Sequence, residues 1–178
     1  VEHKDVHGHL YHIRYQFKDL DDYLVVATTR PETLLGDTAV AIAPDDMDKR
    51  NLVGKKVIIP FVNREVEIIV DEHVDKEFGS GFVKVTPAHD PNDFEIGIRH
   101  KLKQVIVIDK HGCILPVCQI FKDEAYHDEL PIPDTIAGLD RFDARKIIIE
   151  ELEKLDQLEK IEKHTHAVGH SYRSHVPI

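Results

Sequence analysis

Apolar and polar residues alternate near the start of the chain. Over residues 9–17, the apolar side chains of Tyr11, Ile13, Tyr15 and Phe17 are separated by single polar residues. Successive side chains of a strand point to opposite faces, so this pattern predicts a strand with one buried face.

Six further apolar runs predict short strands at residues 23–29, 38–43, 55–60, 65–71, 81–88 and 104–109. A Gly or Pro lies near most of the connections. Residues 30–37, which include Pro31 and Gly36, are expected to form a loop. Strands this short favour a curved or closed sheet. We therefore expect a mixed α/β fold, in which a barrel-like mixed β-sheet is flanked by a few α-helices.

The segment DPNDFEIGIRHKL predicts a helix that starts beside Asp90. Asp90 is suited to the N-cap and Pro91 to the first helical position. Phe94, Ile98 and Leu102 recur at every fourth position, which is typical of a buried helical stripe.

A second helix is predicted over residues 144–163, ARKIIIEELEKLDQLEKIEK. Asp143 can cap it at the start. Ile148, Leu152 and Leu155 then form an apolar stripe that is expected to face the core.

The composition is that of a globular domain. Hydrophobic residues make up 42% of the 178 residues and charged residues 31%, so the chain can bury one substantial core. No apolar run approaches the ~20 residues that span a bilayer, and the polar start is unlike a signal peptide. Cys113 and Cys118 lack a CxxC spacing, which fits a reducing, cytoplasmic location. The missing initiator Met and the strand-like end SYRSHVPI indicate a single domain, residues 1–178, excised from a longer chain.

The charge limits the possible partners. A formal net charge of −10 argues against a surface that attracts nucleic acid everywhere. It is compatible with a small pocket that receives one end of a nucleic acid held mainly by other domains.

Two carboxylates follow the strand predicted at residues 81–88. Asp90 and Asp93 lie three positions apart, which suits helix capping, the commoner use of such a pair, or a carboxylate held towards a cleft. The two roles can coexist. On the strand itself, Lys84 and Thr86 share a face, which is either the wall of a polar pocket or the solvent face of an edge strand.

Hydroxyl groups gather after the second predicted strand, where Thr28, Thr29 and Thr33 flank Arg30. Hydroxyls and a guanidinium can hold ribose and phosphate. A turn stabilised by Thr side chains is the commoner use of such a cluster.

Motifs for metal, nucleotide or covalent chemistry are missing from the sequence: there is no HExxH, GxGxxG, P-loop or GxSxG. His89, Asp90 and Asp93 could ligate a metal, but no second ligand cluster accompanies them. Histidines also gather near the end of the chain, in what is expected to be a polar, mobile tail: His164, His166, His170 and His175.

Two motifs together resemble a known family. TTRPETLLGDTAVAI, which starts at Thr28, and GSGFVKVTPAHDPNDFEIGIRH, residues 79–100, are similar to the editing domain of valyl-tRNA synthetase. That domain is a connective polypeptide inserted into the catalytic domain of the class I enzymes for valine, isoleucine and leucine. Glu32 after Pro31 and the motif HDPND point to the valyl type.

The resemblance implies a set of site residues. The catalytic set is Asp93, Asp90, Lys84 and Thr86, and the substrate-binding set is Thr28, Thr29, Arg30, Thr33, Phe78 and His89. Asp93 matches the carboxylate that binds the α-ammonium group, a charge-assisted pairing. Lys84, Thr86 and Asp90 match positions that line the threonine pocket, and a Lys–Asp arrangement can donate to and accept from one hydroxyl. Phe78 matches an aromatic that could stack on a base of the tRNA end.

The implied reaction removes threonine from tRNA(Val). Valine and threonine are nearly isosteric, and an apolar pocket separates them only ~10²-fold, a value established for the valyl enzyme. A polar second site would hydrolyse the wrong ester with a positioned water, using no metal or other cofactor, because ATP and Mg serve only the synthetic domain. The expected partners are the 3′ end of tRNA(Val) carrying threonine and the rest of the synthetase, and no membrane.

Three alternatives stay open. The chain could be an editing domain of the isoleucyl or leucyl type, which rejects a different amino acid. It could bind a tRNA end without hydrolysing it, or it could be a metal-dependent hydrolase. A deacylation assay with threonyl- and valyl-tRNA(Val) distinguishes the first two alternatives from a valyl-type editing domain. Activity that is unchanged in excess chelator would exclude the metal-dependent hydrolase.

Overall fold

The computed structural model describes the backbone of residues 2–170 and the side chains of residues 8–163. Ten strands, two α-helices and two 3-10 helices follow one another in this part of the chain. The strands are β1 (Glu2–Phe17), β2 (Tyr23–Thr28), β3 (Ala39–Ile42), β4 (Lys56–Ile58), β5 (Glu65–Val70), β6 (Val83–Val85), β7 (Gln104–Ile108), β8 (Ile114–Lys122), β9 (Ala125–Pro131) and β10 (Leu158–His170). The helices are η1 (Pro31–Gly36), η2 (Met47–Leu52), α1 (Pro91–His100) and α2 (Arg141–Lys154). No helix within residues 2–170 has both the length and the apolar character that crossing a membrane requires.

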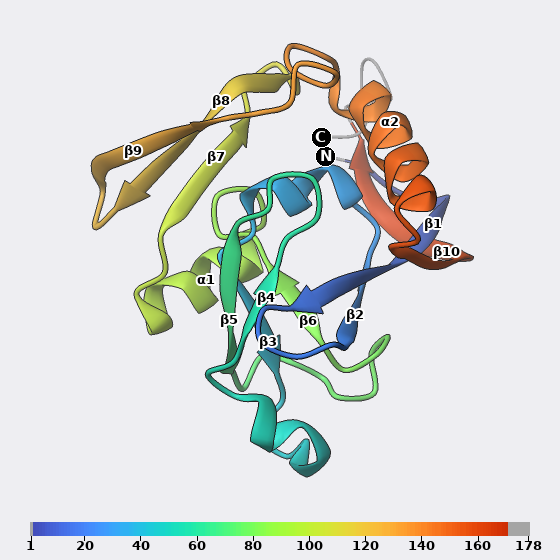
Figure 1. Ribbon diagram of the computed structural model, residues 1–178. Coiled ribbons are helices and arrows are strands. Elements are labelled where there is room, and N and C mark those ends of the chain that lie inside the picture. Colours follow the sequence, from blue (N-terminus) through green and yellow to red (C-terminus); the bar gives the residue numbers. More distant parts are fainter. Residues whose placement is uncertain (1, 171–178) are drawn as a thin grey trace.

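Seven strands form one curved sheet in the order β10-β1-β4-β5-β3-β6, and β2 pairs with β1 beside that path. β3 and β5 are parallel, whereas the other pairs are antiparallel. β2 returns close to β6, so the sheet nearly closes into a barrel (Figure 1). This confirms the barrel-like mixed sheet expected from the sequence.

A second sheet, β7-β8-β9, extends from the barrel as an arm (Figure 1). β8 and β9 were not predicted. Asp123 and Glu124, which join them, both have positive φ values of 51° and 65°, as a two-residue type I′ turn requires. The pair Asp-Glu is not one of the usual signals for that turn, which is why the sequence pattern did not reveal the hairpin.

The core lies between the curved sheet, η1 and α2. Ile13, Tyr15 and Phe17 are buried there, as the alternation at the start of the chain predicted. Residues 30–37 are not the expected loop, because Pro31–Gly36 form η1, and all six residues of this helix are buried. Pro31 suits the first turn, where a backbone N–H has no helical partner.

The second predicted helix is wrong at both ends. Asp140, and not Asp143, caps α2 by accepting a hydrogen bond from the Phe142 amide at 2.9 Å. The helix ends at Lys154, and Leu155 is 57% exposed instead of facing the core. The next segment is β10, which pairs with β1. Pairing with the free edge of β1 overrides the helical propensity of this charged segment.

This strand also corrects the expectation of a mobile tail. His164, His166 and His170 belong to β10 and lie opposite β1, whereas His175 and the strand-like end lie outside the described residues.

α1 begins as predicted, with Asp90 at the N-cap and Pro91 at the first position. The predicted buried stripe is wrong for Phe94 and Ile98, which are 43% and 64% exposed because the helix packs on its Ile96–Gly97 face. Leu102, just beyond the helix, is partly buried against the core. A Cβ atom at Gly97 would lie 3.0 Å from Cβ of Pro87, so glycine permits this close approach.

Candidate active site

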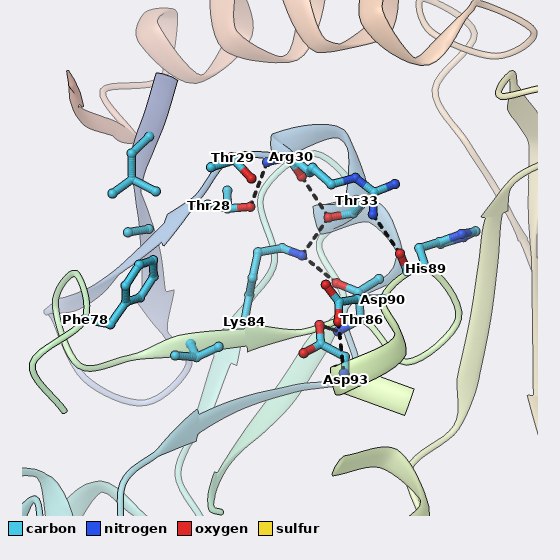
Figure 2. A pocket seen from close by; sticks show the side chains of 13 residues that line it. Thr28, Thr29, Arg30, Thr33, Phe78, Lys84, Thr86, His89, Asp90 and Asp93 are labelled. Carbon is cyan, nitrogen blue, oxygen red and sulfur yellow. Dashed lines mark hydrogen bonds between the residues drawn. The ribbon is translucent and has the colours of Figure 1, made fainter. Parts of the chain in front are cut away.

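A polar pocket of about 180 Å³ lies where β2, η1, β6 and the start of α1 converge (Figure 2). All ten residues predicted for the site line it, and the other lining residues are Leu10, Ala27 and Val83. The threonine-rich segment forms one wall, β6 the floor, and the HDPND motif the opposite wall. Two segments far apart in the sequence are therefore brought together as the resemblance implied.

Lys84 lies at the centre of the floor and is only 7% exposed. Its Nζ donates to Thr33 Oγ1 at 2.8 Å and to Thr86 Oγ1, and it pairs with Asp37 Oδ1 at 2.7 Å. The face that carries Lys84 and Thr86 is therefore a buried pocket wall and not the solvent face of an edge strand. Because an ammonium group has three donors, all of them are occupied within the protein. Direct donation from Lys84 to a substrate hydroxyl would require one of these bonds to break.

Asp37 and Tyr15 extend the floor beneath the pocket. Asp37 is fully buried and accepts hydrogen bonds from Thr86 Oγ1 at 2.7 Å and from the Tyr15 hydroxyl at 2.5 Å. Burial raises the pKa of the Asp37 carboxyl, and Lys84 opposes that rise. Sequence reasoning missed both residues, because Asp37 fell in a predicted loop and Tyr15 was counted as core.

Asp90 and Asp93 divide the two roles that the sequence left open. Oδ1 of Asp90 accepts from the amides of Asn92 at 2.8 Å and Asp93 at 3.2 Å, which caps α1. Oδ2 of Asp93 accepts from the Thr86 amide at 2.8 Å, which fixes this carboxylate at the pocket wall. Burial raises the pKa of Asp93 to about 6, and the nearby Asp90 adds to the rise.

His89 contributes more through its backbone than through its ring. Its carbonyl oxygen accepts from Arg30 Nη1 at 2.7 Å, and Nε2 accepts from the Val107 amide at 3.0 Å. Burial and the nearby cations lower the pKa of His89 to about 4, so the ring is neutral at physiological pH and carries its proton on Nδ1. Figure 2 shows the ring directed away from the cluster of pocket side chains, so it anchors the wall to β7.

The threonine-rich segment is held by its own side chains. Thr28 Oγ1 accepts from the Arg30 amide at 3.0 Å, and Thr33 Oγ1 donates to the Arg30 carbonyl at 2.8 Å. Phe78 lies across the pocket and is 45% exposed, so one face of its ring is available to a ligand.

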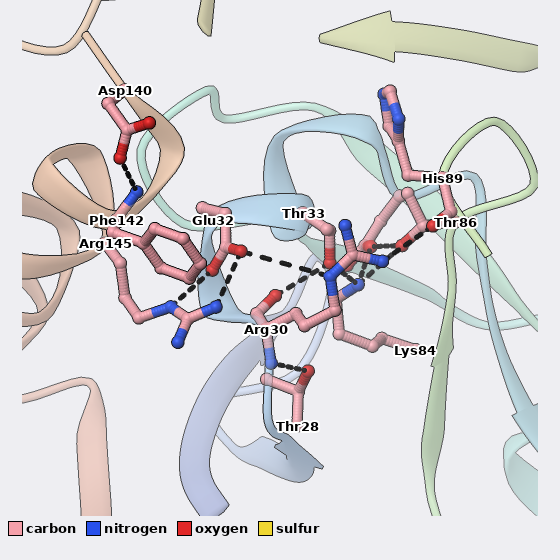
Figure 3. A network of polar contacts seen from close by, with 11 residues as sticks. Thr28, Arg30, Glu32, Thr33, Lys84, Thr86, His89, Asp140, Phe142 and Arg145 are labelled. Carbon is pink, nitrogen blue, oxygen red and sulfur yellow. Dashed lines mark hydrogen bonds and ion pairs between the residues drawn. The ribbon is translucent and has the colours of Figure 1, made fainter. Parts of the chain in front are cut away.

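A buried ion pair ties this segment to α2 (Figure 3). Glu32 is fully buried and accepts two hydrogen bonds of 2.8 Å from Nε and Nη2 of Arg145. Nε of Arg30 lies 4.0 Å from the same carboxylate. No local sequence pattern indicates this pair, because its partners lie 113 positions apart.

The pocket is rich in hydrogen-bond acceptors. Within the residues whose side chains are described, no three His, Cys, Asp or Glu side chains are grouped so as to hold a metal ion. The free lone pairs belong to hydroxyl and carboxylate oxygens, which suit a ligand that carries an ammonium group and a hydroxyl.

Comparison with known proteins identifies the class. Residues 45–153 match the family model described as leucyl-tRNA synthetase, editing domain, and the chain belongs to this family. The fold is similar to that of a leucyl-tRNA synthetase from Agrobacterium radiobacter, solved as a ternary complex with tRNA and LeuAMS. The TM-score is 0.60, with 21% identity over 92% of this chain and 20% of that one.

Curated relatives give the particular type. The chain is 52% identical to a valine–tRNA ligase of Staphylococcus haemolyticus over 98% of its length. It is 54% identical to the valine–tRNA ligase of Carboxydothermus hydrogenoformans over 97% of its length. In both cases it spans 18% of the relative. The resemblance to a valyl-type editing domain is therefore confirmed.

Proposed function

We propose that this chain is the post-transfer editing domain of a valine–tRNA ligase and hydrolyses the ester of threonyl-tRNA(Val). Its partners are then the 3′ end of tRNA(Val) and the rest of the ligase, in the cytoplasm. The observation that carries the proposal is the pocket floor, where Lys84 uses its donors on Thr33, Thr86 and Asp37.

That floor can distinguish threonine from valine. Thr33 Oγ1 donates to the Arg30 carbonyl and Thr86 Oγ1 donates to Asp37, so each oxygen accepts from Lys84 and keeps one lone pair. A threonine hydroxyl can donate to such a lone pair. A valine methyl would cover it without a hydrogen bond, at roughly 1–3 kcal/mol for each buried polar group.

Asp93 provides the anchor for the α-ammonium group. Its carboxylate is held by the Thr86 amide, beside the floor that reads the side chain. A pKa of about 6 leaves it ionised at physiological pH, and a bound ammonium would favour the ionised form further.

The reaction needs a positioned water and no covalent intermediate. Water adds to the ester carbonyl, the bond between the carbonyl carbon and the ribose oxygen breaks, and the ribose oxygen takes a proton. The vicinal ribose hydroxyl can assist that proton transfer. Phe78 would stack on the terminal base, while positioning and electrostatics supply most of the rate. No metal or other cofactor takes part.

The test is deacylation of threonyl- and valyl-tRNA(Val) by the chain, with and without excess chelator. We expect selective hydrolysis of the threonyl ester that chelator does not change. Asp93→Ala should abolish hydrolysis in a folded protein, whereas Asp143→Ala, at an exposed position of α2, should not. Equal hydrolysis of the two esters, or full activity of Asp93→Ala, would contradict the proposal.

A leucyl-type substrate is the second candidate, because the matching family model and the similar structure are both leucyl. The same assay with mischarged tRNA(Leu) and tRNA(Ile) decides between them. Faster hydrolysis of either than of threonyl-tRNA(Val) would favour the second candidate.

A further inference from the structure

The solvent side of α1 has an apolar surface that the fold does not cover. Phe94 and Ile98 lie one turn apart and are 43% and 64% exposed. With Pro87, Leu102 and Phe121 they line a groove of about 590 Å³, which Asp123 and Glu124 also line. The groove starts beside the active-site pocket, because Pro87 follows Thr86 and Phe94 follows Asp93 in the chain.

A basic groove continues from the far end of this surface. It has a volume of about 710 Å³ and shares Lys101 and Leu102 with the apolar groove. Five Lys and Arg side chains line it against three Asp and Glu, in a chain of net charge −10. One of the three carboxylates, Glu65, already pairs with Lys18 at 3.1 Å.

Two buried polar atoms in the basic groove lack a partner. Nε of Arg64 and Oγ1 of Thr38 form no hydrogen bond within the described part of the chain. The guanidinium donates from Nη2 to the Leu35 carbonyl at 2.7 Å, and burial lowers its pKa. The buried Asp37 carboxylate supplies a nearby negative charge that opposes this lowering, so the unpartnered Nε is what remains available to a ligand in the groove.

We propose that the surface along α1 is an RNA track: Phe94 and Ile98 contact bases, and Lys101, Lys103 and Lys122 contact phosphates of the strand whose 3′ end enters the pocket. This rests on the proposed function and extends it to the partner's backbone. Exposed aromatic side chains beside cations are the combination that single-stranded nucleic acid binds.

The length of α1 determines how many nucleotides separate the reacting 3′ end from the basic groove. Its ten residues span roughly 15 Å, at about 1.5 Å per residue. A stacked strand rises roughly 3.4 Å per nucleotide, so the basic groove lies about four to five nucleotides from the reacting end. The track therefore reaches past the terminal adenosine to the acceptor stem.

The charge test uses Lys103→Glu/Lys122→Glu, with Lys110→Glu/Lys154→Glu as a control of equal charge away from the groove. Each variant is assayed with threonyl-tRNA(Val) and with threonyl-adenosine, which is too short to reach the track. For the groove variant we expect KM for the tRNA to rise about tenfold relative to the control, with kcat and threonyl-adenosine hydrolysis unchanged. The slope of log affinity for uncharged tRNA against log salt should fall by about 2.

The stacking test uses Phe94→Leu, which keeps the apolar bulk, with Phe142→Leu on α2 as the exposed aromatic control. Loss of one stacked base should weaken tRNA binding at least about fivefold. Unchanged tRNA affinity in both groove variants would overturn the track and leave this surface to the rest of the ligase. A loss that is equal with threonyl-adenosine would also overturn it. Failure of the unmodified chain to hydrolyse either ester would instead contradict the proposed function, since uncharged tRNA still tests the track.

Discussion

The pocket floor and the surface along α1 treat polar and apolar groups in opposite ways. On the floor, Lys84 and Asp37 are buried and each has partners within the protein. Along α1, Phe94 and Ile98 are exposed, and the cations at the helix end face a groove. A site that must distinguish a hydroxyl from a methyl is more selective when its polar groups are rigid and already hydrogen-bonded. A surface that binds a flexible nucleic-acid strand needs side chains that are exposed to solvent and free to contact it.

The largest expected difference in unfolding free energy is between a lysine of the pocket floor and a lysine of the basic groove. Lys84→Met leaves the buried Asp37 carboxylate without its cation, so unfolding free energy should fall by about 3–5 kcal/mol. The exposed Lys103→Met should change it by less than about 0.5 kcal/mol. Urea denaturation measures both. The double variant Lys84→Met/Asp37→Asn should recover part of the loss, and additive losses would show that the two side chains are not coupled.

The two faces of α1 give the next comparison. Ile96→Ala removes a side chain that is only 1% exposed, and should cost about 2–4 kcal/mol. Phe94→Gln, two positions earlier in the same helix, should cost less than about 0.5 kcal/mol because its ring already contacts solvent. Thermal and urea unfolding measure both. Equal costs would mean that Phe94 is part of the core.

The ion pair behind the pocket should have an intermediate effect. Arg145→Met leaves Glu32 with only the distant Arg30 guanidinium, at a cost of about 2–3 kcal/mol. Arg30 should then turn towards Glu32 and away from the His89 carbonyl, which raises KM for the ester. The exposed neighbour Lys146→Met is the control. If Arg145→Met loses stability while KM stays unchanged, the pair does not position Arg30.

The smallest effect has a size that depends on pH. The folded pKa of Asp93 is about 6 against an ordinary value of 3.8, so ionisation destabilises the fold as pH rises through this interval. Asp93→Asn should therefore add about 1–2 kcal/mol at pH 8 and little at pH 4, while hydrolysis is lost. Urea unfolding at both pH values measures this. An equal change at both would mean that the carboxylate does not titrate as described.

The sequence predicted which residues gather around the pocket better than it predicted the packing behind them. Asp90, Asp93, Lys84 and the threonine-rich segment belong to contiguous motifs, so resemblance could carry them over together. Local signals also placed the first strand and the start of α1. What failed depends on distant partners: β10 is a strand because β1 has a free edge, and Phe94 and Ile98 are exposed because α1 packs on its other face.

The same limit applies to individual site residues. Asp37 is recognised as part of the pocket floor only in the folded structure, where β6 places Lys84 against it. Arg145 is recognised as a partner of Glu32 only because α2 packs on η1. The division of roles between Asp90 and Asp93 needed the structure, because spacing alone favours helix capping and does not show which carboxylate lies at the pocket wall.

The hydrogen-bonded network of the pocket floor also restricts which substitutions can accumulate in such a sequence. Tyr15, Asp37, Lys84 and Thr86 come from three separate segments and depend on one another. Replacing any one of them leaves a buried polar group without its partner. Single-substitution variants on the way to a new specificity would therefore fold poorly. Residues at the rim, such as Phe78 and Thr29, carry no such penalty. New substrate preferences in this fold should therefore arise first at the rim, and the floor should change only in paired steps.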